Sequence, residues 1–290
     1  MNIFIENFPW YPFFTILSVL WGACIGSFLN VCIYRIPIEL SVVTPPSHCP
    51  ACKKPIAWYQ NIPVLSYLFL NGKCANCGTR ISPRYVLVEL LVALLFLLAW
   101  LKFDITPGTR PLGLDAITDF KLIPVYWLVI MGLVLGTFVD FEHMIIPDRV
   151  TLGGIVCGLI ASALVPSLHG QSHALPALLQ SAIGAAFGWG LLWGVAIIGE
   201  LIFKKEAMGF GDVKLMGAIG AFFGWQAVLF TIIISSFAGS IVGVAFIISG
   251  KKELQSKIPY GPYISLAALL WIYWGETWWN LYISFITGVR

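Results

Sequence analysis

Long apolar runs separated by short polar stretches cover most of this chain. A helix needs about 20 mostly apolar residues to cross the hydrocarbon core of a bilayer, at a rise of about 1.5 Å per residue. The first run, residues 13–33, meets this requirement and contains no charged side chain. Eight runs approach it, although the sixth is short: residues 13–33, 85–101, 122–139, 150–165, 177–203, 213–223, 227–249 and 260–274. The pattern predicts an all-α, polytopic membrane protein with about eight transmembrane helices.

The composition strengthens the membrane assignment. Of the 290 residues, 59% are hydrophobic and 11% are charged, and the mean hydropathy is +0.87. Soluble domains are about one quarter charged. The first apolar run follows a single charged residue, Glu6, and lacks the basic stretch that opens a signal peptide. We therefore expect this run to be retained as a membrane anchor.

Basic residues are distributed unevenly between the two sides of the predicted topology. If both termini lie outside, the outer side holds Lys102, Arg110, Lys121 and Arg290. The other side holds the remaining thirteen: Arg35, Lys53, Lys54, Lys73, Arg80, Arg84, Arg149, Lys204, Lys205, Lys214, Lys251, Lys252 and Lys257. Lys and Arg accumulate in short cytoplasmic loops, so this second side is expected to face the cytoplasm. The net charge of +3 then reflects topology, and no basic nucleic-acid-binding module is present.

Four of the seven cysteines form two Cys-x2-Cys pairs, Cys49 with Cys52 and Cys74 with Cys77, separated by 21 residues. They lie in the polar loop 35–84, on the side assigned to the cytoplasm, where disulfides are disfavoured. Four thiolates at this spacing are typical of a tetrahedral, structural zinc site without an open position for water. Reduced, unligated thiols are the alternative.

Zinc would give this loop folding energy that about 50 residues cannot obtain from a core of their own. The chain is therefore expected to divide into three parts. Residues 1–34 form the first transmembrane helix, residues 35–84 form a small cytoplasmic zinc-binding loop domain, and residues 85–290 form the remaining helices.

Two aspartates, Asp140 and Asp212, lie where apolar segments meet the predicted cytoplasmic face. A carboxylate at membrane depth costs about 3 to more than 10 kcal/mol. Paired carboxyl groups suit hydrolysis, because one can act as base and the other as acid while they titrate as a unit. Simpler roles are also open: Asp212 can cap a helix, and Asp140 can form an ion pair at the boundary. The helix dipole makes Asp212 the better candidate for the ionised partner.

Other polar and small residues have simpler expected roles. Asp148 is expected to cap the next helix in solvent. Glu89 and Glu200 lie inside apolar runs, and each is either a functional residue or a hydrogen-bond partner of a neighbouring helix. The spacing of Gly22 and Gly26 predicts close packing between helices.

A series of short motifs resembles the bacterial type IV prepilin leader peptidases, also called pseudopilin peptidases in type II secretion. Each motif alone is weak, whereas their joint order is specific and covers nearly the whole chain. The motifs are Gly26-Ser27-Phe28-Leu29-Asn30-Val31 before Arg35-Ile36-Pro37, the two cysteine pairs around Asn61-Ile62-Pro63, Arg84-Tyr85 before Glu89, Asp140 before Ile146-Pro147-Asp148, Gly209-Phe210-Gly211-Asp212 with Lys214, and Pro259-Tyr260-Gly261-Pro262-Tyr263.

The resemblance implies an aspartic endopeptidase of the Gly-x-Gly-Asp type in the bacterial inner membrane, with Asp140 and Asp212 as its catalytic pair. Such enzymes remove a short basic leader from prepilins or pseudopilins at the cytoplasmic face, after a glycine. Many then methylate the new amino terminus with S-adenosylmethionine. The residues that hold this donor are not identified, because the chain has no Rossmann-type glycine fingerprint.

Two other classes of function account for part of the sequence. A proton- or ion-coupled transporter also keeps acids inside the membrane, but it favours acids near the middle of the bilayer and inverted halves. This chain has boundary acids and no detectable repeat. A non-enzymatic assembly factor explains the cysteine loop but leaves the two aspartates without a role.

Overall fold

The computed structural model describes residues 10–103, 113–117, 119–204, 208–249 and 259–288. Within these ranges all regular elements are helices, and β-type pairing is limited to the isolated bridges His48 to Pro55 and Lys73 to Arg80. The prediction of an all-α protein is confirmed for the described residues. The chain separates into two compact units, Met1–Pro111 and Leu112–Arg290.

The first unit is built on two long helices, α2 (Trp10–Arg35) and α4 (Arg84–Leu101), which pack against each other. The loop between them contains the short helices η1 (Ile36–Ile38), η2 (Trp58–Asn61) and α3 (Leu65–Phe69). The zinc-loop cysteines therefore belong to the same unit as α2 and α4.

Two glycines allow α2 and α4 to approach closely. A Cβ atom added to Gly22 would lie 2.7 Å from the Cα of Ala93, and one added to Gly26 would lie 2.7 Å from the Cα of Glu89. No ordinary side chain fits at such distances, so the helix backbones themselves are in contact. The packing role predicted for these glycines is confirmed.

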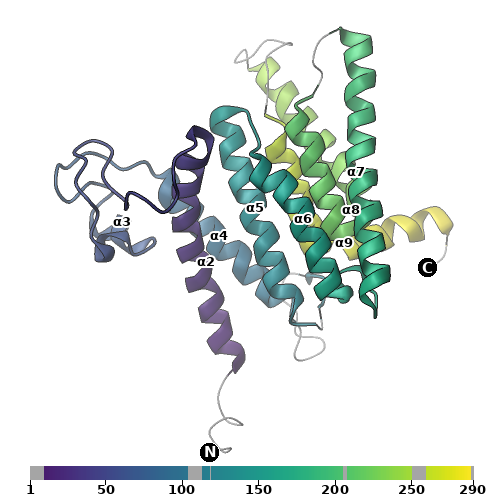
Figure 1. The fold of residues 1–290 in the computed structure, drawn as a ribbon, viewed down its shortest axis with the longest axis horizontal. Coiled ribbons are helices and arrows are strands. Elements are labelled where there is room, and N and C mark those ends of the chain that lie inside the picture. The colour runs from purple at the N-terminus through teal and green to yellow at the C-terminus, as the bar shows by residue number, and fades with distance from the viewer. Residues whose placement is uncertain (1–9, 104–112, 118, 205–207, 250–258, 289–290) are drawn as a thin grey trace, which may run out of the picture. The chain divides into compact units, whose positions relative to one another are not determined.

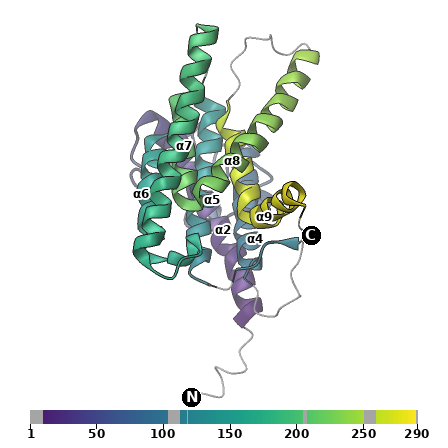
Figure 2. The same ribbon diagram turned by 90° about the vertical axis from the view of Figure 1, so that its right-hand side faces the viewer.

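The second unit is a bundle whose helices lie side by side, as Figures 1 and 2 show. Its helix α8 packs against α6, α7 and α9, and α5 packs against α6 and α9. The bounds are α5 (Leu122–His143), α6 (Asp148–Leu164), η4 (Pro166–His169), α7 (Ala174–Phe203), α8 (Phe210–Ile248) and α9 (Gly261–Thr287).

Helix α8 folds back on itself at Gly224, whose φ of 77° and ψ of −179° suit a residue without a side chain. A Cβ atom added to Gly188 of α7 would lie 2.4 Å from the carbonyl oxygen of Met216 and 3.1 Å from Cγ2 of Val228. In a straight helix Met216 and Val228 would be about 18 Å apart. The two halves, residues 210–223 and 225–248, therefore run beside each other and correspond to the sixth and seventh predicted runs.

Helix α9 extends to Thr287, well beyond residue 274 where the last apolar run was expected to end. The buried side chain of Asp115 accepts hydrogen bonds from the backbone N–H groups of Glu276 and Thr277, at 2.8 and 3.2 Å. It also accepts a hydrogen bond from the Thr277 hydroxyl group, at 2.6 Å. Asp115 thus acts as an N-cap, supplied by another segment, for the part of α9 that follows Gly275.

Five stretches within the described residues are long and apolar enough to cross a membrane: Trp10–Ile38, Arg84–Leu101, Leu122–His143, Ala174–Ile202 and Phe210–Ile248. They support a multi-pass membrane protein. The count of eight spans stays a prediction, because α6 and α9 are not among the five. Of the predicted topology markers, Arg110, Lys205, Lys251, Lys252, Lys257 and Arg290 lie outside the described residues.

Candidate active site and metal centre

The two aspartates singled out in the sequence lie together in the second unit. Asp140 is in the last turn of α5 and Asp212 is in the first turn of α8. Both side chains are buried, with exposed fractions of 5% and 8%, and the two carboxyl groups lie within electrostatic range of each other. The bundle therefore brings two acids to one place at the ends of apolar helices.

Each aspartate accepts a hydrogen bond from the backbone N–H of a glycine. Gly261 donates to Asp140 Oδ2 at 3.0 Å, and Gly209 donates to the Asp212 carboxyl group. Gly209 is the N-cap of α8, so Asp212 is the third residue of the helix and not its cap. An acidic side chain that reaches back to the N-cap amide is one half of a capping box. Helix capping and chemistry are compatible at this position, because the amide groups of the first turn favour negative charge.

The side chain of Ile146 contacts all three chain segments that form this site. A Cβ atom on Gly261 would lie 2.9 Å from Ile146 Cδ1, and one on Gly211 would lie 3.2 Å from Ile146 Cβ. A Cβ atom on Gly136 of α5 would lie 3.5 Å from Ile146 Cγ2. Ile146 thus fixes the spacing between α5 and the starts of α8 and α9.

The predicted helix cap at Asp148 is wrong. Pro147 occupies the N-cap position of α6, with extended backbone, and Asp148 is the first residue of the helix. Its side chain, 62% exposed, instead accepts a hydrogen bond from Lys214 Nζ at 2.6 Å. This ion pair joins the start of α6 to the first turns of α8, two residues after Asp212.

The four loop cysteines converge in the first unit, with all four sulfur atoms within 4.8 Å of one another. Each pair forms the same turn: Cys49 and Cys74 both donate their backbone N–H to the carbonyl five residues later, at 3.0 and 2.9 Å. The equivalent residues Lys53 and Gly78 both have a left-handed backbone, with φ of 58° and 70°.

This arrangement fits a zinc ion. Zinc–sulfur bonds of about 2.3 Å in a tetrahedron place the sulfur atoms about 3.8 Å apart. The Sγ atoms of Cys49 and Cys77 are 3.8 Å apart. Hydrogen bonding to Thr79 lowers the pKa of the Cys77 thiol to about 6. At neutral pH one of the four thiolates of a zinc site is therefore available without the metal, whereas the pKa of the Cys52 thiol is raised to about 11 and this thiol would lose its proton only on binding the metal.

Glu89 is buried in α4 and connects three parts of the first unit. Its carboxyl group forms a hydrogen bond with the side chain of Ser27 in α2. Its Oε2 atom accepts a second hydrogen bond, of 2.7 Å, from the backbone N–H of Val64. Val64 has φ 62° and ψ −51°, and Leu65 N–H donates to Pro63 O at 2.6 Å across it. This is a γ-turn centred on a β-branched residue, a conformation that is rare and strained. Of the two predicted roles for Glu89, hydrogen bonding to a neighbouring helix is the one observed.

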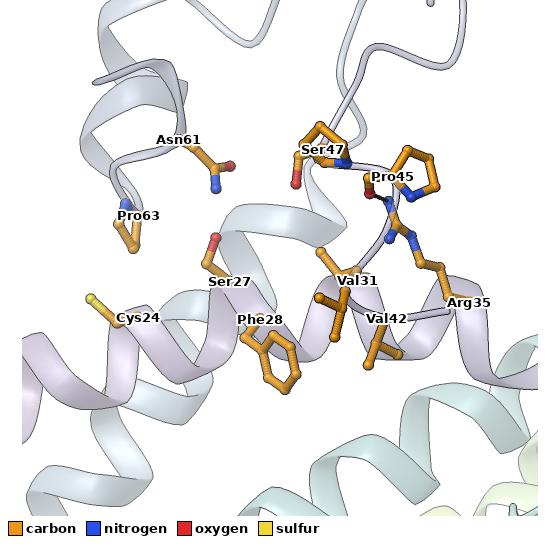
Figure 3. Close-up of a pocket in the computed structure, with 12 residues that line it drawn as sticks. Cys24, Ser27, Phe28, Val31, Arg35, Val42, Pro45, Ser47, Asn61 and Pro63 are labelled. Atoms are coloured by element: carbon orange, nitrogen blue, oxygen red, sulfur yellow. Dashed lines mark hydrogen bonds between the residues drawn. The ribbon is translucent and has the colours of Figure 1, made fainter. Parts of the chain in front are cut away.

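A pocket of about 360 Å³ opens beside Ser27, between the last turns of α2 and the following loop. Figure 3 shows the side chains of Ser27 and Asn61 pointing toward each other across it. The Arg35 guanidinium group lies at one end and donates to Ser41 O and Pro45 O, at 2.9 and 2.8 Å.

The hydrogen bond to a neighbouring helix that was predicted as one role of Glu200 is not found among the described residues, and its functional role stays a prediction. Its side chain is exposed in the last turn of α7 and has no hydrogen-bond partner among the residues described. Sequence reasoning also missed the roles of Ile146, Gly261 and Asp115. The motifs around the first two were visible in the sequence, but nothing local to Asp115 predicts that it caps a helix about 160 residues further along.

Comparison with known proteins gives a consistent result. The family model described as "Bacterial Peptidase A24 N-terminal domain" matches residues 20–103, and that of the "Type IV leader peptidase family" matches residues 127–244. Two relatives named prepilin leader peptidase/N-methyltransferase come from Aeromonas salmonicida, 34% identical over 97% of each chain, and Pseudomonas aeruginosa, 33% over 94% of each. A third, from Myxococcus xanthus, is 37% identical over 84% of this chain and 67% of its own. No solved structure matches the chain.

The cysteine cluster predicts about one structural zinc per chain. Replacing any one of Cys49, Cys52, Cys74 or Cys77 by Ser should lower the metal content of the purified protein and make the loop more susceptible to protease. Cys157→Ser, which changes a thiol in α6, is the matched control and should retain the metal. Elemental analysis that finds no zinc in carefully purified protein would rule out the tetrathiolate site.

Proposed function

This chain belongs to the type IV leader peptidase family, and from that membership we propose that it removes the leader peptide from type IV prepilins or type II secretion pseudopilins. The observation that carries the proposal is the pair of buried carboxyl groups, Asp140 and Asp212, at the end of the second unit's bundle. Acids inside apolar segments are costly and mark functional sites, and a pair of them suits hydrolysis.

In this proposal the pair hydrolyses a peptide bond as an aspartic peptidase of the Gly-x-Gly-Asp type. Two carboxyl groups this close share a proton, so one is a base while the other is an acid. The base takes a proton from water, whose oxygen attacks the carbonyl carbon. The acid protonates the carbonyl oxygen, and the amine leaves after it has been protonated. The glycine amides hold one oxygen of each carboxyl group and leave another for water or substrate.

We further propose that the site faces the cytoplasm from the inner membrane. The asymmetry of basic residues, thirteen against four, supports this orientation. The proposed organisation keeps residues 1–34 as an anchor, residues 35–84 as a cytoplasmic loop with structural zinc, and residues 85–290 as the part that carries the peptidase pair. The transporter alternative finds no support, since both acids lie at helix ends and are hydrogen-bonded to glycine amides.

The name of the relatives includes a second activity, and we propose N-methylation of the new amino terminus with S-adenosylmethionine as donor. The donor supplies an electrophilic methyl group. Once deprotonated, the amine attacks the methyl carbon with its lone pair, and the electron pair of the carbon–sulfur bond remains on sulfur as a neutral thioether. The methylated ammonium group then releases a proton to solvent. This step needs no pair of acids and can therefore be separated from hydrolysis.

Topology is tested by labelling thiols from outside intact cells. We expect Cys49 and Cys74 to be protected from an impermeant reagent in sealed cells even after a permeant chelator has removed zinc. The same cysteines should react once the cells are opened. Labelling in sealed, metal-stripped cells would place the loop outside and contradict the proposed orientation.

The catalytic pair is tested by three substitutions measured side by side. Asp140→Asn and Asp212→Asn should each lower cleavage of a prepilin-like substrate by at least the 100- to 10,000-fold that acid–base assistance supplies, as an order of magnitude. Asn keeps the shape of the side chain but can neither carry the charge nor supply the acid proton, and losing one member of a unit costs nearly as much as losing both.

Asp148→Asn is the matched control. It removes an exposed ion pair worth about 0–1 kcal/mol and should have a mild effect. Methylation of a pre-cleaved substrate should persist in all three variants and would report that they are folded. Normal cleavage by Asp212→Asn together with an inactive Asp148→Asn would identify a different pair.

Substitution of Gly261 tests whether its backbone amide positions the carboxyl group of Asp140. Gly261→Ala places a Cβ atom 2.8 Å from Asp140 Oδ2 and 2.9 Å from Ile146 Cδ1, so it should displace the carboxyl group and lower kcat more than it changes KM. Adding Ile146→Val removes Cδ1 and should restore part of the lost kcat. Such a rescue is non-additive coupling between contacting residues.

Gly239→Ala is the control for this test, because its Cβ atom would make only ordinary contact with Tyr263, at 3.6 Å. It should cleave normally. If Gly261→Ala behaves like Gly239→Ala, the amide of Gly261 does not position Asp140.

A further inference from the structure

The first turn of α9 is tied to α8 by the side chain of Tyr260, a residue that the proposed hydrolysis leaves without a role. Tyr260 is the N-cap residue of α9, immediately before Gly261, whose backbone N–H donates to Asp140 Oδ2 at 3.0 Å. The Tyr260 hydroxyl oxygen lies 2.7 Å from Oγ of Ser235 and 3.2 Å from Oγ of Ser236. Both serines lie in the half of α8 that follows its reversal. The residue beside the Asp140 contact is therefore also bonded to a different helix.

The three hydroxyl groups form a chain of hydrogen bonds with a defined direction. Ser235 donates to the carbonyl oxygen of Ile232 at 3.3 Å, and each hydroxyl group has one proton to donate. The Tyr260 hydroxyl therefore donates to Ser235 and accepts from Ser236. The Ser235 side chain is fully buried, so the packing around it holds it in place. Tyr260 is thereby anchored to a fixed point on α8.

The position of Tyr260 determines where the Gly261 amide lies. The two residues share one planar peptide unit, in which the N–H of Gly261 points away from the C=O of Tyr260. That carbonyl oxygen accepts the backbone N–H groups of Tyr263 and Ile264, at 3.0 and 3.2 Å, so it points into the first turn of α9. The helical turn thus orients the amide toward Asp140, and the phenol fixes the place of the turn relative to α8.

The rings of Tyr260 and Tyr263 both lie against α8 at Gly239. A Cβ atom on this glycine would lie 3.8 Å from Tyr260 Cε2 and 3.6 Å from Tyr263 Cδ2. Gly239 follows Ser235 by four residues, so the ring contacts and the hydrogen bonds use the same face of the helix. The Tyr263 hydroxyl, in contrast, forms no hydrogen bond with another described residue. Of these two neighbouring tyrosines, only Tyr260 is bonded to α8 through its hydroxyl group.

We propose that Tyr260 is a positioning residue of the peptidase pair. Through its hydrogen bonds to Ser235 and Ser236 it holds the Gly261 amide where that amide fixes the Asp140 carboxyl group. A misplacement of about 1 Å can cost about 100-fold in rate, so small shifts of the amide matter. Tyr260 acts through Gly261 and has no contact with the substrate in this assignment. The assignment rests on the proposed aspartic peptidase mechanism.

Tyr260→Phe in the full-length protein in detergent tests the assignment, because it removes the hydroxyl group and keeps the ring. It should lower kcat for a prepilin-like substrate by about twofold to tenfold, the size expected for one lost hydrogen bond, and change KM little. Ser235 can still donate to Ile232 O in this variant, so no buried hydroxyl proton loses its acceptor. Tyr263→Phe makes the same chemical change three residues away and is the matched control, with kcat unchanged.

Ser235→Ala removes the hydrogen bond from its other side. It should lower kcat to a similar extent, and the double variant with Tyr260→Phe should lose no more than the larger single loss, because both changes break the same bond. Ser240→Ala is the matched control on α8. The exposed Ser240 hydroxyl donates to the carbonyl oxygen of Ser236 in its own helix, at 2.7 Å, and its loss should leave kcat unchanged.

Combining Tyr260→Phe with Gly261→Ala separates a positioning role from a general loosening of the bundle. Gly261→Ala alone should already displace the Asp140 carboxyl group, since its Cβ atom would lie 2.8 Å from Oδ2. Adding Tyr260→Phe should then lower kcat little further, because the amide no longer holds the carboxyl group in place. If the phenol only stabilised the bundle, the two losses would multiply.

The possible failures can be told apart. Cleavage by Tyr260→Phe equal to that by Tyr263→Phe would overturn the assignment, as would losses that multiply with that of Gly261→Ala. A raised KM with unchanged kcat would make Tyr260 a substrate-binding residue and also contradict it. The proposed function fails separately, if the unmodified protein does not cleave the substrate or if Asp140→Asn cleaves it normally.

Discussion

The second unit depends on a close approach of backbone to carboxyl groups inside an apolar bundle. A buried carboxyl group needs hydrogen-bond donors, and here they are the amides of Gly261 for Asp140 and Gly209 for Asp212. Donors on long side chains would add bulk and charge, whereas a glycine amide adds neither. A Cβ atom at Gly261 would come within 2.8 Å of the carboxyl group, so any other residue at this position would have to displace it.

The same close approach explains why motifs far apart in the chain form one site. Ile146 packs against a glycine of α5 and against glycines in the first turns of α8 and α9. It therefore connects α5 and α8, which each carry an aspartate, with the start of α9, which supplies the amide of Gly261. The reversal of α8 at Gly224 and the packing of α7 against both of its halves hold these helix starts in one bundle. The glycines against which Ile146 packs therefore reflect backbone geometry, because a side chain on any of them would meet Ile146.

Much of this arrangement could be predicted from the sequence. The apolar runs located every long helix to within a few residues, except that α9 extends further, and the paired cysteines and the two aspartates each converge. Predictions based on neighbouring residues failed where a side chain forms its hydrogen bonds with a group that is distant in the sequence. Asp148 has the residue type of a helix cap, but Pro147 already occupies that position and Lys214 attracts the carboxylate. Asp115 and Glu89 find their partners across the fold, and short-range patterns contain no information about such pairs.

The two units accommodate buried carboxyl groups in different ways. In the second unit, the carboxyl groups of Asp140 and Asp212 lie within electrostatic range of each other, and two such groups do not ionise together easily. In the first unit, a single buried carboxyl group, that of Glu89, is held by Ser27 of α2 and by the backbone N–H of Val64. Each unit thus satisfies its buried acids with hydrogen-bond donors of its own, which lie on segments distant in the sequence from the acids they serve or, for Asp212, at the start of its own helix.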